Sequence, residues 1–144
     1  MSTRRIVVGV DGSESSREAL RWAKAQADVT GAELVAVTAW SYPVASFPML
    51  VNQVATTDTF DVEGQSRAAL QRVVKETIGD AEVAQRVLEG HPVTVMLAAA
   101  QDADLVVVGS RGHGGFVGSL LGSVSQSLVA HAGCPVVVVR QRTS

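Results

Sequence analysis

Residues 105–123 read LVVVGSRGHGGFVGSLLGS, an apolar run that leads into a stretch rich in glycine. The run Leu105–Val108 contains no polar residue, which is typical of a buried strand in a parallel sheet. Apolar residues from Leu121 onward recur at helical spacing and predict a helix that ends at Gly133. Strand, glycine-rich loop and helix in this order are typical of a phosphate site, because glycines let backbone N–H groups face an anion and the helix N-terminus adds donors.

The glycine-rich segment, residues 109–123, holds six glycines in fifteen positions. Each glycine costs backbone entropy, so this density favours a functional reason over a purely structural one. The segment is not a P-loop, because that motif needs Gly-Lys-Ser/Thr and both lysines, Lys24 and Lys75, lie elsewhere. It is not the dinucleotide fingerprint either, because no glycine follows Gly112 and Gly114 at the required spacing and the segment comes after the fourth predicted strand.

Composition excludes several classes of protein. The chain has 144 residues, of which 47% are hydrophobic and 4% aromatic, so its core must consist of Val, Ala and Leu. A net charge of -2, from 12 basic and 14 acidic residues, argues against a nucleic-acid partner. No apolar run approaches the roughly 20 residues of a membrane helix, and the N-terminal residues do not resemble a signal peptide. The single cysteine, Cys134, cannot form an intrachain disulfide, so we expect a cytoplasmic protein without a membrane partner.

Predicted strands alternate with predicted helices along the whole chain. The strands are Ile6–Val10, Leu34–Thr38, Val83–Leu88, Leu105–Val108 and Pro135–Arg140. The helices are one between a Ser13 cap and Gly31, one from Asp58 to Ile78, one from Pro92 to about Ala103, and the one that ends at Gly133. Residues 41–57 hold two prolines without a clean period and predict a loop or a partial helix. This alternation predicts a single α/β domain over residues 1–144, an open parallel sheet with helices on both faces and right-handed crossovers.

Ligands of such sheets bind beyond the carboxyl ends of the strands, where the strand order reverses. Asp11 follows the first strand, and the glycine-rich segment follows the fourth. If these strands are neighbours at the reversal, both loops face one pocket. Two plainer interpretations stay open: Asp11 is a common turn residue before Gly12, and Arg111 is a solvated loop charge instead of a partner for phosphate.

Other reactive side chains carry weaker arguments. His113 has no second His, Cys or acidic residue at ligand spacing, so we interpret it as a loop histidine. His91 and His131 flank predicted helix ends, where capping or surface roles suffice. Cys134 precedes a buried strand, and we interpret it as a small core residue and not as a reactive thiol.

The glycine-rich segment has the spacing Gly-x2-Gly-x9-Gly-Ser, formed by Gly109, Gly112, Gly122 and Ser123. In this motif the chain resembles the universal stress protein family, in its ATP-binding branch. The resemblance covers nearly the whole chain. Its pieces are residues 6–13, IVVGVDGS, residues 103–112, ADLVVVGSRG, and residues 133–139, GCPVVVV.

The resemblance implies a Rossmann-like, adenine nucleotide α-hydrolase-like sheet of five strands in the order 3-2-1-4-5, with ATP between the first and fourth strands. It implies that Asp11 faces the nucleotide and its divalent metal, Mg²⁺ or Mn²⁺, and that the backbone at Thr38 recognises adenine. The full set of nucleotide-binding positions that it implies is Gly9, Asp11, Thr38, Gly109, Ser110, Arg111, Gly112, His113, Gly114, Gly115, Gly122, Ser123 and Val124.

In that strand order the fifth strand presents Val136–Val139 as an open apolar edge, and such edges aggregate unless they are covered. Two copies paired across a two-fold axis would cover it, and the resemblance also implies a homodimer there. The alternative is an edge hidden by the C-terminal residues 141–144.

The sequence predicts an ATP-binding regulator of the stress response with little turnover, because a phosphate site comes without a recognisable catalytic set. We therefore assign no catalytic residue and expect a protein that is not primarily an enzyme. Two alternatives stay open. One is a slow ATPase or an enzyme that phosphorylates itself on Ser110, Ser119 or Ser123. The other is an interaction module, including one that binds another adenine nucleotide.

Overall fold

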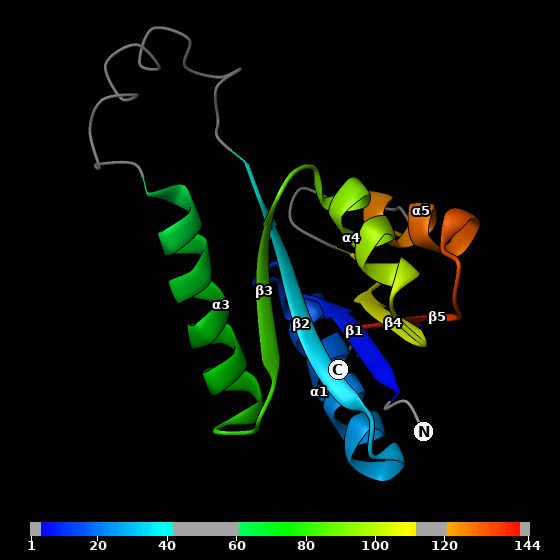
Figure 1. The fold of residues 1–144 in the computed structure, drawn as a ribbon, viewed down its shortest axis with the longest axis horizontal. Helices are drawn as coiled ribbons and strands as arrows, with labels where there is room; N and C mark the ends of the chain where they lie inside the picture. Colours follow the sequence, from blue (N-terminus) through cyan, green and yellow to red (C-terminus); the bar gives the residue numbers. More distant parts are fainter. Residues whose placement is uncertain (1–3, 42–60, 112–120, 142–144) are drawn as a thin grey trace, which may run out of the picture.

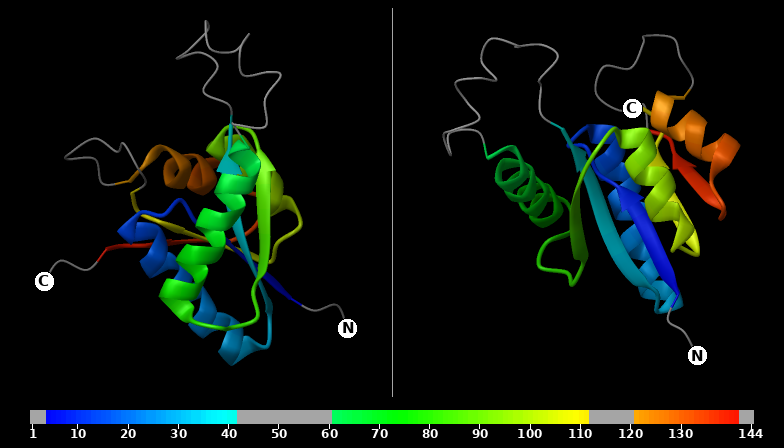
Figure 2. Two further views of the ribbon diagram at one scale, coloured as in Figure 1. Left: turned by 90° about the vertical axis from the view of Figure 1, so that its left-hand side faces the viewer. Right: turned by 45° about the horizontal axis from the view of Figure 1, so that its top comes forward.

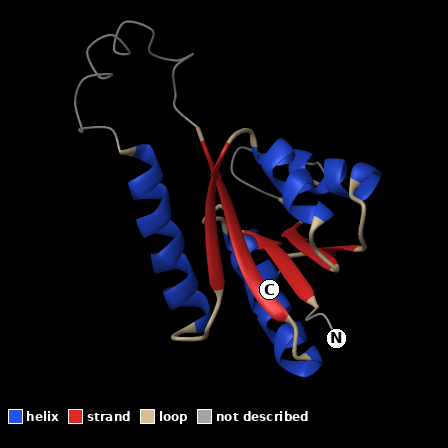
Figure 3. Ribbon diagram, viewed as in Figure 1, coloured by secondary structure: helices blue, strands red, loops and turns tan. Residues whose placement is uncertain are grey.

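Parallel strands form a single open sheet in the structure, a computed structural model that describes residues 4–41, 61–111 and 121–141 (Figure 1, Figure 3). The strand order is β3-β2-β1-β4-β5. The strands are β1 (Arg5–Gly9), β2 (Glu33–Trp40), β3 (Ala84–Glu89), β4 (Leu105–Gly109) and β5 (Val136–Val139). The helices are α1 (Glu14–Thr30), α3 (Val62–Ile78), α4 (Pro92–Gln101) and α5 (Ser123–His131). The predicted α/β class, parallel pairing and strand order are confirmed.

Both faces of the sheet are covered by helices. Ile6 and Val8 of β1 belong to an apolar core with α1 and α3, whereas Val7 between them belongs to a second core with α4 and α5. Figure 2 shows α4 on the opposite side of the sheet from α1. Alternate strand residues thus enter opposite cores, which explains why the strands read as continuous apolar runs.

Helix α1 has the ends that the sequence predicts. The hydroxyl of Ser13 accepts a hydrogen bond from the Ser16 N–H at 3.2 Å and caps the N-terminus. Gly31 ends the helix with a φ of 74°, a left-handed conformation that favours glycine. The first residues of α1 therefore follow the end of β1 after a short turn, which fixes the entrance to the candidate site.

Helix α3 begins later than the expected start at Asp58. The Asp61 side chain accepts a hydrogen bond from the Gly64 N–H at 2.9 Å and caps a helix whose first residue is Val62. Residues 42–60, which contain most of the predicted loop and Asp58 itself, lie outside the described residues.

Strand β2 is longer than predicted because it pairs with two strands of different extent. Its register with β1 ends at Gly9 beside Val37, but its register with β3 continues to Trp40 beside Glu89. The other ends shift slightly: β5 lacks the expected Pro135 and Arg140, and α4 and α5 each stop two residues before the expected end. In the described part of the chain no helix is long and apolar enough to cross a membrane.

Candidate functional site

The strand order reverses between β1 and β4. Strand β1 pairs with β2 on one side and with β4 on the other, where Val8 lies beside Val107. From this edge β1 leads to α1, and β4 leads to the glycine-rich segment. The structure thus brings Asp11 and Ser110 to the ends of neighbouring strands, at the switch point where open α/β sheets bind ligands.

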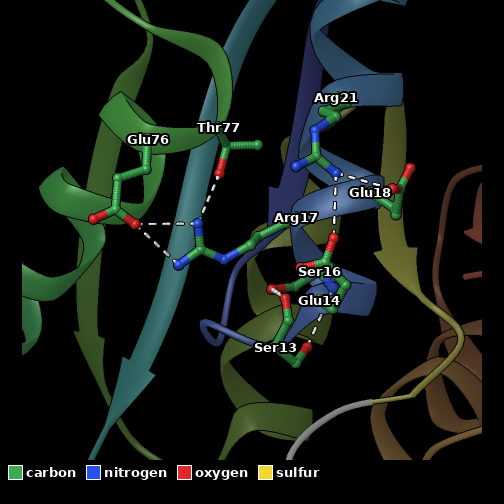
Figure 4. Close-up of polar contacts among 8 residues, drawn as sticks. All are labelled: Ser13, Glu14, Ser16, Arg17, Glu18, Arg21, Glu76 and Thr77. Carbon is green, nitrogen blue, oxygen red and sulfur yellow. Dashed lines mark hydrogen bonds and ion pairs between the residues drawn. The ribbon is translucent and has the colours of Figure 1, made fainter.

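Asp11 is oriented by the first turn of α1. Its Oδ1 accepts hydrogen bonds from the Ser13 N–H at 2.9 Å and from the Ser13 hydroxyl at 2.5 Å. The Asp11 N–H in turn donates to Ser16 Oγ at 3.3 Å. Figure 4 shows Ser13 and Ser16 joined in this turn. Asp11 is exposed, so its carboxylate is held in place beside a helix N-terminus and remains accessible from solvent.

Gly109, the last residue of β4, lies directly against α1. A Cβ at this position would overlap Ser15 Oγ and would stand 2.7 Å from the Ser15 carbonyl carbon and oxygen. The close approach of α1 to β4 therefore requires glycine here, whether or not a phosphate also approaches. This packing role is one that the motif did not reveal.

Ser110 follows at the root of the glycine-rich segment and is buried, with 6% exposed. Its N–H donates to the Val139 carbonyl of β5 at 2.9 Å, and its carbonyl accepts from the Gly122 N–H at 2.6 Å. Ser110 therefore ties the end of β4 to both β5 and the start of α5.

The N-terminus of α5 stands beside Ser110. Gly122 is its N-cap residue in an extended conformation, φ -75° and ψ 171°, and as a glycine it has no side chain with which to cap the helix. Ser123 and Val124 are the first two residues of α5. Their N–H groups therefore belong to the first turn of the helix, whose N–H groups have no acceptors within the helix. These donors and the positive end of the helix dipole give the edge a site that favours an anion.

Arg111 supplies a positive charge at the same edge. Its backbone N–H donates to Ser15 Oγ at 3.2 Å, and its side chain is exposed. Among the residues that the structure describes, no carboxylate pairs with its guanidinium. Gly112, His113, Gly114 and Gly115, which the sequence also predicts as nucleotide-binding, lie outside the described residues.

Gly9 and the end of β2 complete the edge. A Cβ on Gly9 would lie 3.1 Å from Met96 Cε and 3.3 Å from Val108 Cγ1, so this glycine faces α4. In β2 the Val37 carbonyl accepts from Val10 N–H at 2.9 Å, on the side of β1.

The backbone direction alternates along β2, and the Trp40 carbonyl accepts from the Gly90 N–H at 2.8 Å on the side of β3. By the same alternation the backbone groups of Thr38 face β3. The backbone N–H and C=O groups of Ala39 face the side of β1, at a level that lies beyond the last residue of that strand. Thr38 lies near the carboxyl end of β2, and its neighbour Ala39 is the residue whose backbone faces the candidate site.

Sequence reasoning missed three buried serines at this edge, Ser15, Ser16 and Ser125. A signal was present in the sequence, because Ser15 and Ser16 stand one helical turn before the core residues Ala19 and Leu20 and thus on the buried face of α1. Polar side chains at core-facing helical positions are uncommon, and they need hydrogen-bond partners.

The remaining candidates take the structural roles that were expected. His91 Nδ1 accepts a hydrogen bond from the Val93 N–H at 3.2 Å and caps α4, and His131 is the last residue of α5. Burial, followed by the nearby Asp104 carboxylate, raises the pKa of the Cys134 thiol, and a backbone hydrogen bond with Val106 acts in the opposite direction. A raised pKa keeps this thiol protonated at neutral pH, which disfavours nucleophilic chemistry.

A separate hollow of about 600 Å³ lies between the last turns of α1 and the segment before β3. Lys24, Asp28, Glu33 and Glu82 supply its charged groups. It opens at the amino ends of β2 and β3, at the opposite edge from the strand ends that bind ligands in such sheets. The candidate site is therefore the carboxyl edge between β1 and β4.

The comparisons with known proteins agree on one family. The profile of the Universal stress protein family matches residues 2–140. A universal stress protein of Mycolicibacterium smegmatis is 37% identical over 95% of this chain and 46% of its own length. Universal stress protein Rv1996 of Mycobacterium tuberculosis is 38% identical over 94% of this chain and 43% of its own length. The chain spans about half the length of these curated relatives.

Solved structures share the fold. Hypothetical protein MJ0577 superposes with a TM-score of 0.78 at 22% identity, with 100% of both chains covered. A universal stress protein in complex with cAMP gives a TM-score of 0.63 at 28% identity, covering 96% of this chain and 98% of the other. The universal stress protein from Archaeoglobus fulgidus in complex with dAMP gives a TM-score of 0.61 at 25% identity, covering 96% of this chain and 99% of the other. With its profile match, its relatives and its fold in agreement, the chain belongs to the universal stress protein family.

Proposed function

We propose that this chain belongs to the ATP-binding branch of its family and regulates a stress response through its nucleotide state, with little turnover. The observation that carries the proposal is the start of α5, a helix N-terminus at the strand switch point whose N-cap residue is Gly122, held beside Ser110. Asp11 and Arg111 lie at the same edge. The related structures with cAMP and dAMP support an adenine nucleotide as the ligand class.

In this proposal the phosphates bind to backbone donors. The first-turn N–H groups of Ser123 and Val124 hold them, Gly122 leaves room for close approach, and the Arg111 guanidinium balances their charge. Asp11 would hold a Mg²⁺ or Mn²⁺ ion that comes with the nucleotide, and such an ion would neutralise part of the phosphate charge. In the described part of the chain no group of three or more His, Cys, Asp or Glu side chains is placed to hold a metal, so the phosphates supply the other oxygen ligands.

The base binds at the end of β2. Backbone N–H and C=O groups of Ala39 face the gap beyond β1, and paired backbone donors and acceptors are suited to the edge of adenine. The predicted contact at Thr38 becomes, in this proposal, a contact with the backbone of the strand at Thr38 and Ala39. Gly9 then serves the packing of α4 below the nucleotide.

The alternative of self-phosphorylation is favoured by one serine. Ser110 is buried and its backbone is tied on both sides, whereas Ser123 is exposed at the first position of α5. An exposed hydroxyl beside the phosphates is the better acceptor, so labelled phosphate on Ser123 after incubation with ATP would favour the enzyme. A cytoplasmic location and a single domain over residues 1–144 stay predictions from the sequence.

The test of ATP binding uses the natural ligand and one backbone variant. The purified protein is denatured, and the released small molecules are identified by mass spectrometry. Titration calorimetry then measures the affinity for ATP with Mg²⁺ against that for GTP with Mg²⁺. We expect a bound adenine nucleotide and a preference for ATP, with a stabilisation of about 2.7 kcal/mol at a ligand concentration 100 times the Kd.

The variant Ser123→Pro removes one backbone donor from the proposed phosphate site. Proline is well accepted at the first position of a helix, and Gly122 already has the extended conformation that precedes proline. Ser123→Ala is the matched control, because it loses the hydroxyl and keeps the N–H. We expect the proline variant to bind ATP more weakly than the alanine variant at equal stability. Equal affinities would remove α5 from the phosphate site, and a wild-type protein without affinity for any adenine nucleotide would refute the function.

We also propose a homodimer through Val136–Val139. Strand β5 ends the sheet, and its four valines are each partly exposed. An open edge of apolar residues favours pairing with a second copy.

A further inference from the structure

We propose that Ser15 and Ser125 are positioning residues, whose hydroxyls fix the start of α5 and the Arg111 backbone relative to Asp11. The inference rests on the nucleotide site proposed above and concerns how that site is held together. Neither hydroxyl needs to touch the nucleotide for this role.

The first observation is where polar side chains are buried. Within the described ranges, the buried polar residues are Ser15, Ser16, Ser110 and Ser125, with 3%, 4%, 6% and 2% exposed. All of them lie at the edge of the sheet where β1 and β4 end, and they are surrounded there by other hydroxyl groups and by backbone polar groups. Burying a hydroxyl costs free energy unless the hydroxyl is hydrogen-bonded. Four buried serines at one edge of the sheet therefore indicate that their hydroxyls have a role there.

Ser15 joins α1 to the chain that leaves β4. Its Oγ accepts the Arg111 N–H at 3.2 Å, and this distance depends on the close contact of Ser15 with Gly109. Ser15 stands in the first turn of α1, and Ser13, the N-cap residue of that turn, holds Asp11. The Arg111 backbone is therefore tied to the same turn as the Asp11 carboxylate.

Ser125 joins the start of α5 to the root of the glycine-rich segment. Its Oγ lies 3.0 Å from the Gly122 carbonyl and 3.4 Å from the Ser110 carbonyl, and its proton can be shared between them. The Gly122 N–H also donates to the Ser110 carbonyl at 2.6 Å. The first turn of α5 is thus held against Ser110.

The two serines act through adjacent residues of the chain. Ser125 fixes α5 to Ser110, and Ser15 fixes Arg111, the next residue, to α1. Together they hold the α5 N-terminus at a constant place relative to Asp11. Donors that are already in position bind a charged ligand without a further ordering cost, so we expect the serines to matter for the phosphate end of the nucleotide.

The test compares ligands with and without phosphates. Ser15→Ala and Ser125→Ala are measured for unfolding in urea and, by calorimetry, for affinity to ATP with Mg²⁺ and to adenosine. We expect ATP affinity to fall about 3- to 10-fold, the size of one hydrogen bond, and adenosine affinity to change less than about 2-fold. The control is Thr77→Val, which loses a part-buried hydroxyl contact with Arg17 at 3.4 Å and should alter neither affinity.

Three outcomes would count against the proposal in different ways. Unchanged ATP affinity in both serine variants, with a wild type that binds ATP, overturns the positioning role alone. Equal losses for ATP and adenosine also overturn it, because they indicate general damage to the fold. A wild type that binds no adenine nucleotide refutes the proposed function and this role with it. If an alanine variant does not fold, Ser15→Cys or Ser125→Cys replaces it, since a thiol keeps the size and bonds weakly.

Discussion

At the scale of single residues, the glycines of this chain serve different purposes although the motif treats them alike. Gly109 is required by α1, whose Ser15 backbone occupies the space of a Cβ. Gly9 faces the flexible end of Met96, and Gly122 begins a helix without a side-chain cap. Spacing in the sequence selects these glycines as one motif, but it cannot distinguish a glycine that admits a ligand from one that admits a helix.

Gly109→Ala should destabilise the protein even without nucleotide. The new Cβ would stand 2.7 Å from two backbone atoms of Ser15, which cannot move without shifting α1. We expect a loss of about 1–3 kcal/mol in the free energy of unfolding, measured in urea. The control is Gly133→Ala, where a Cβ meets no atom within 4 Å. A stable Gly109→Ala variant that has lost only ATP affinity would assign this glycine to the ligand and not to packing.

The contacts of the candidate site could be predicted in part from the sequence. The residues of the motif in the described ranges, such as Asp11 and Gly122, lie at one edge because the fold places the ends of β1 and β4 together. The sequence indicates that Ser15 lies on the core-facing side of its helix, but it does not reveal the backbone groups 96 and 15 positions away that Ser15 and Ser125 contact. Hydrogen bonds of this kind depend on how helices and strands pack together, so the residues near each serine in the sequence give little indication of them.

At the scale of elements, α1 connects the candidate site to the rest of the molecule. Its N-cap residue Ser13 holds Asp11, and one turn later Arg17 reaches α3. Both terminal nitrogens of the Arg17 guanidinium, Nη1 and Nη2, lie 3.2 Å from Glu76 Oε2 (Figure 4). Glu76 is half-exposed, so this ion pair contributes little stability by itself. The cap at Ser13 is the stronger constraint, because it satisfies a helix donor and also orients the Asp11 carboxylate.

Ser13→Ala should therefore weaken both the N-terminus of α1 and the fixed orientation of the Asp11 carboxylate. The variant loses the bond from the Ser16 N–H and the donor to Asp11. We expect a loss of about 1 kcal/mol in the free energy of unfolding, the usual value of a helix cap, and weaker binding of ATP with Mg²⁺. Ser13→Thr keeps the hydroxyl and serves as the control in the same urea and calorimetry measurements. Wild-type stability in Ser13→Ala would show that the cap contributes nothing measurable.

The observed ends of the helices and strands show which of their bounds can be predicted from local sequence and which cannot. Helix α1 has both ends as predicted, because Ser13 and Gly31 act locally through their own backbone. Strand β2 exceeds its prediction because β3 pairs beside it as far as Trp40, a fact of tertiary structure. Local capping residues therefore define the ends of α1, whereas the length of a strand depends on its neighbours.

At the scale of the whole molecule, alternation of strands and helices predicts the parallel sheet, but it does not order the strands. The order 3-2-1-4-5 came from the family resemblance, and the structure confirms it. The consequence of that order is that β3 and β5 form the two edges. Strand β3 has exposed polar residues, as edges usually do, whereas β5 consists of four valines.

The proposed dimer can be tested on the free edge without damage to the sheet itself. The Val139 carbonyl accepts from the Ser110 N–H and the Pro135 carbonyl from the Val106 N–H, so odd-numbered residues of this strand face β4. By alternation the backbone of Val138 faces outward. Val138→Pro removes an outward N–H, which an edge strand tolerates, and Val138→Ala removes similar packing but keeps the N–H.

We expect wild type and Val138→Ala to elute as dimers, and Val138→Pro as a monomer, when mass is measured by light scattering after size-exclusion chromatography. All three should give the circular dichroism of a folded α/β protein. A dimeric Val138→Pro would place the interface elsewhere, and a monomeric wild type would refute the homodimer. The edge lies beside the Ser110–Val139 hydrogen bond, so a dimer here would also stabilise the root of the proposed nucleotide site, and we expect ATP affinity to rise with protein concentration through the monomer–dimer range.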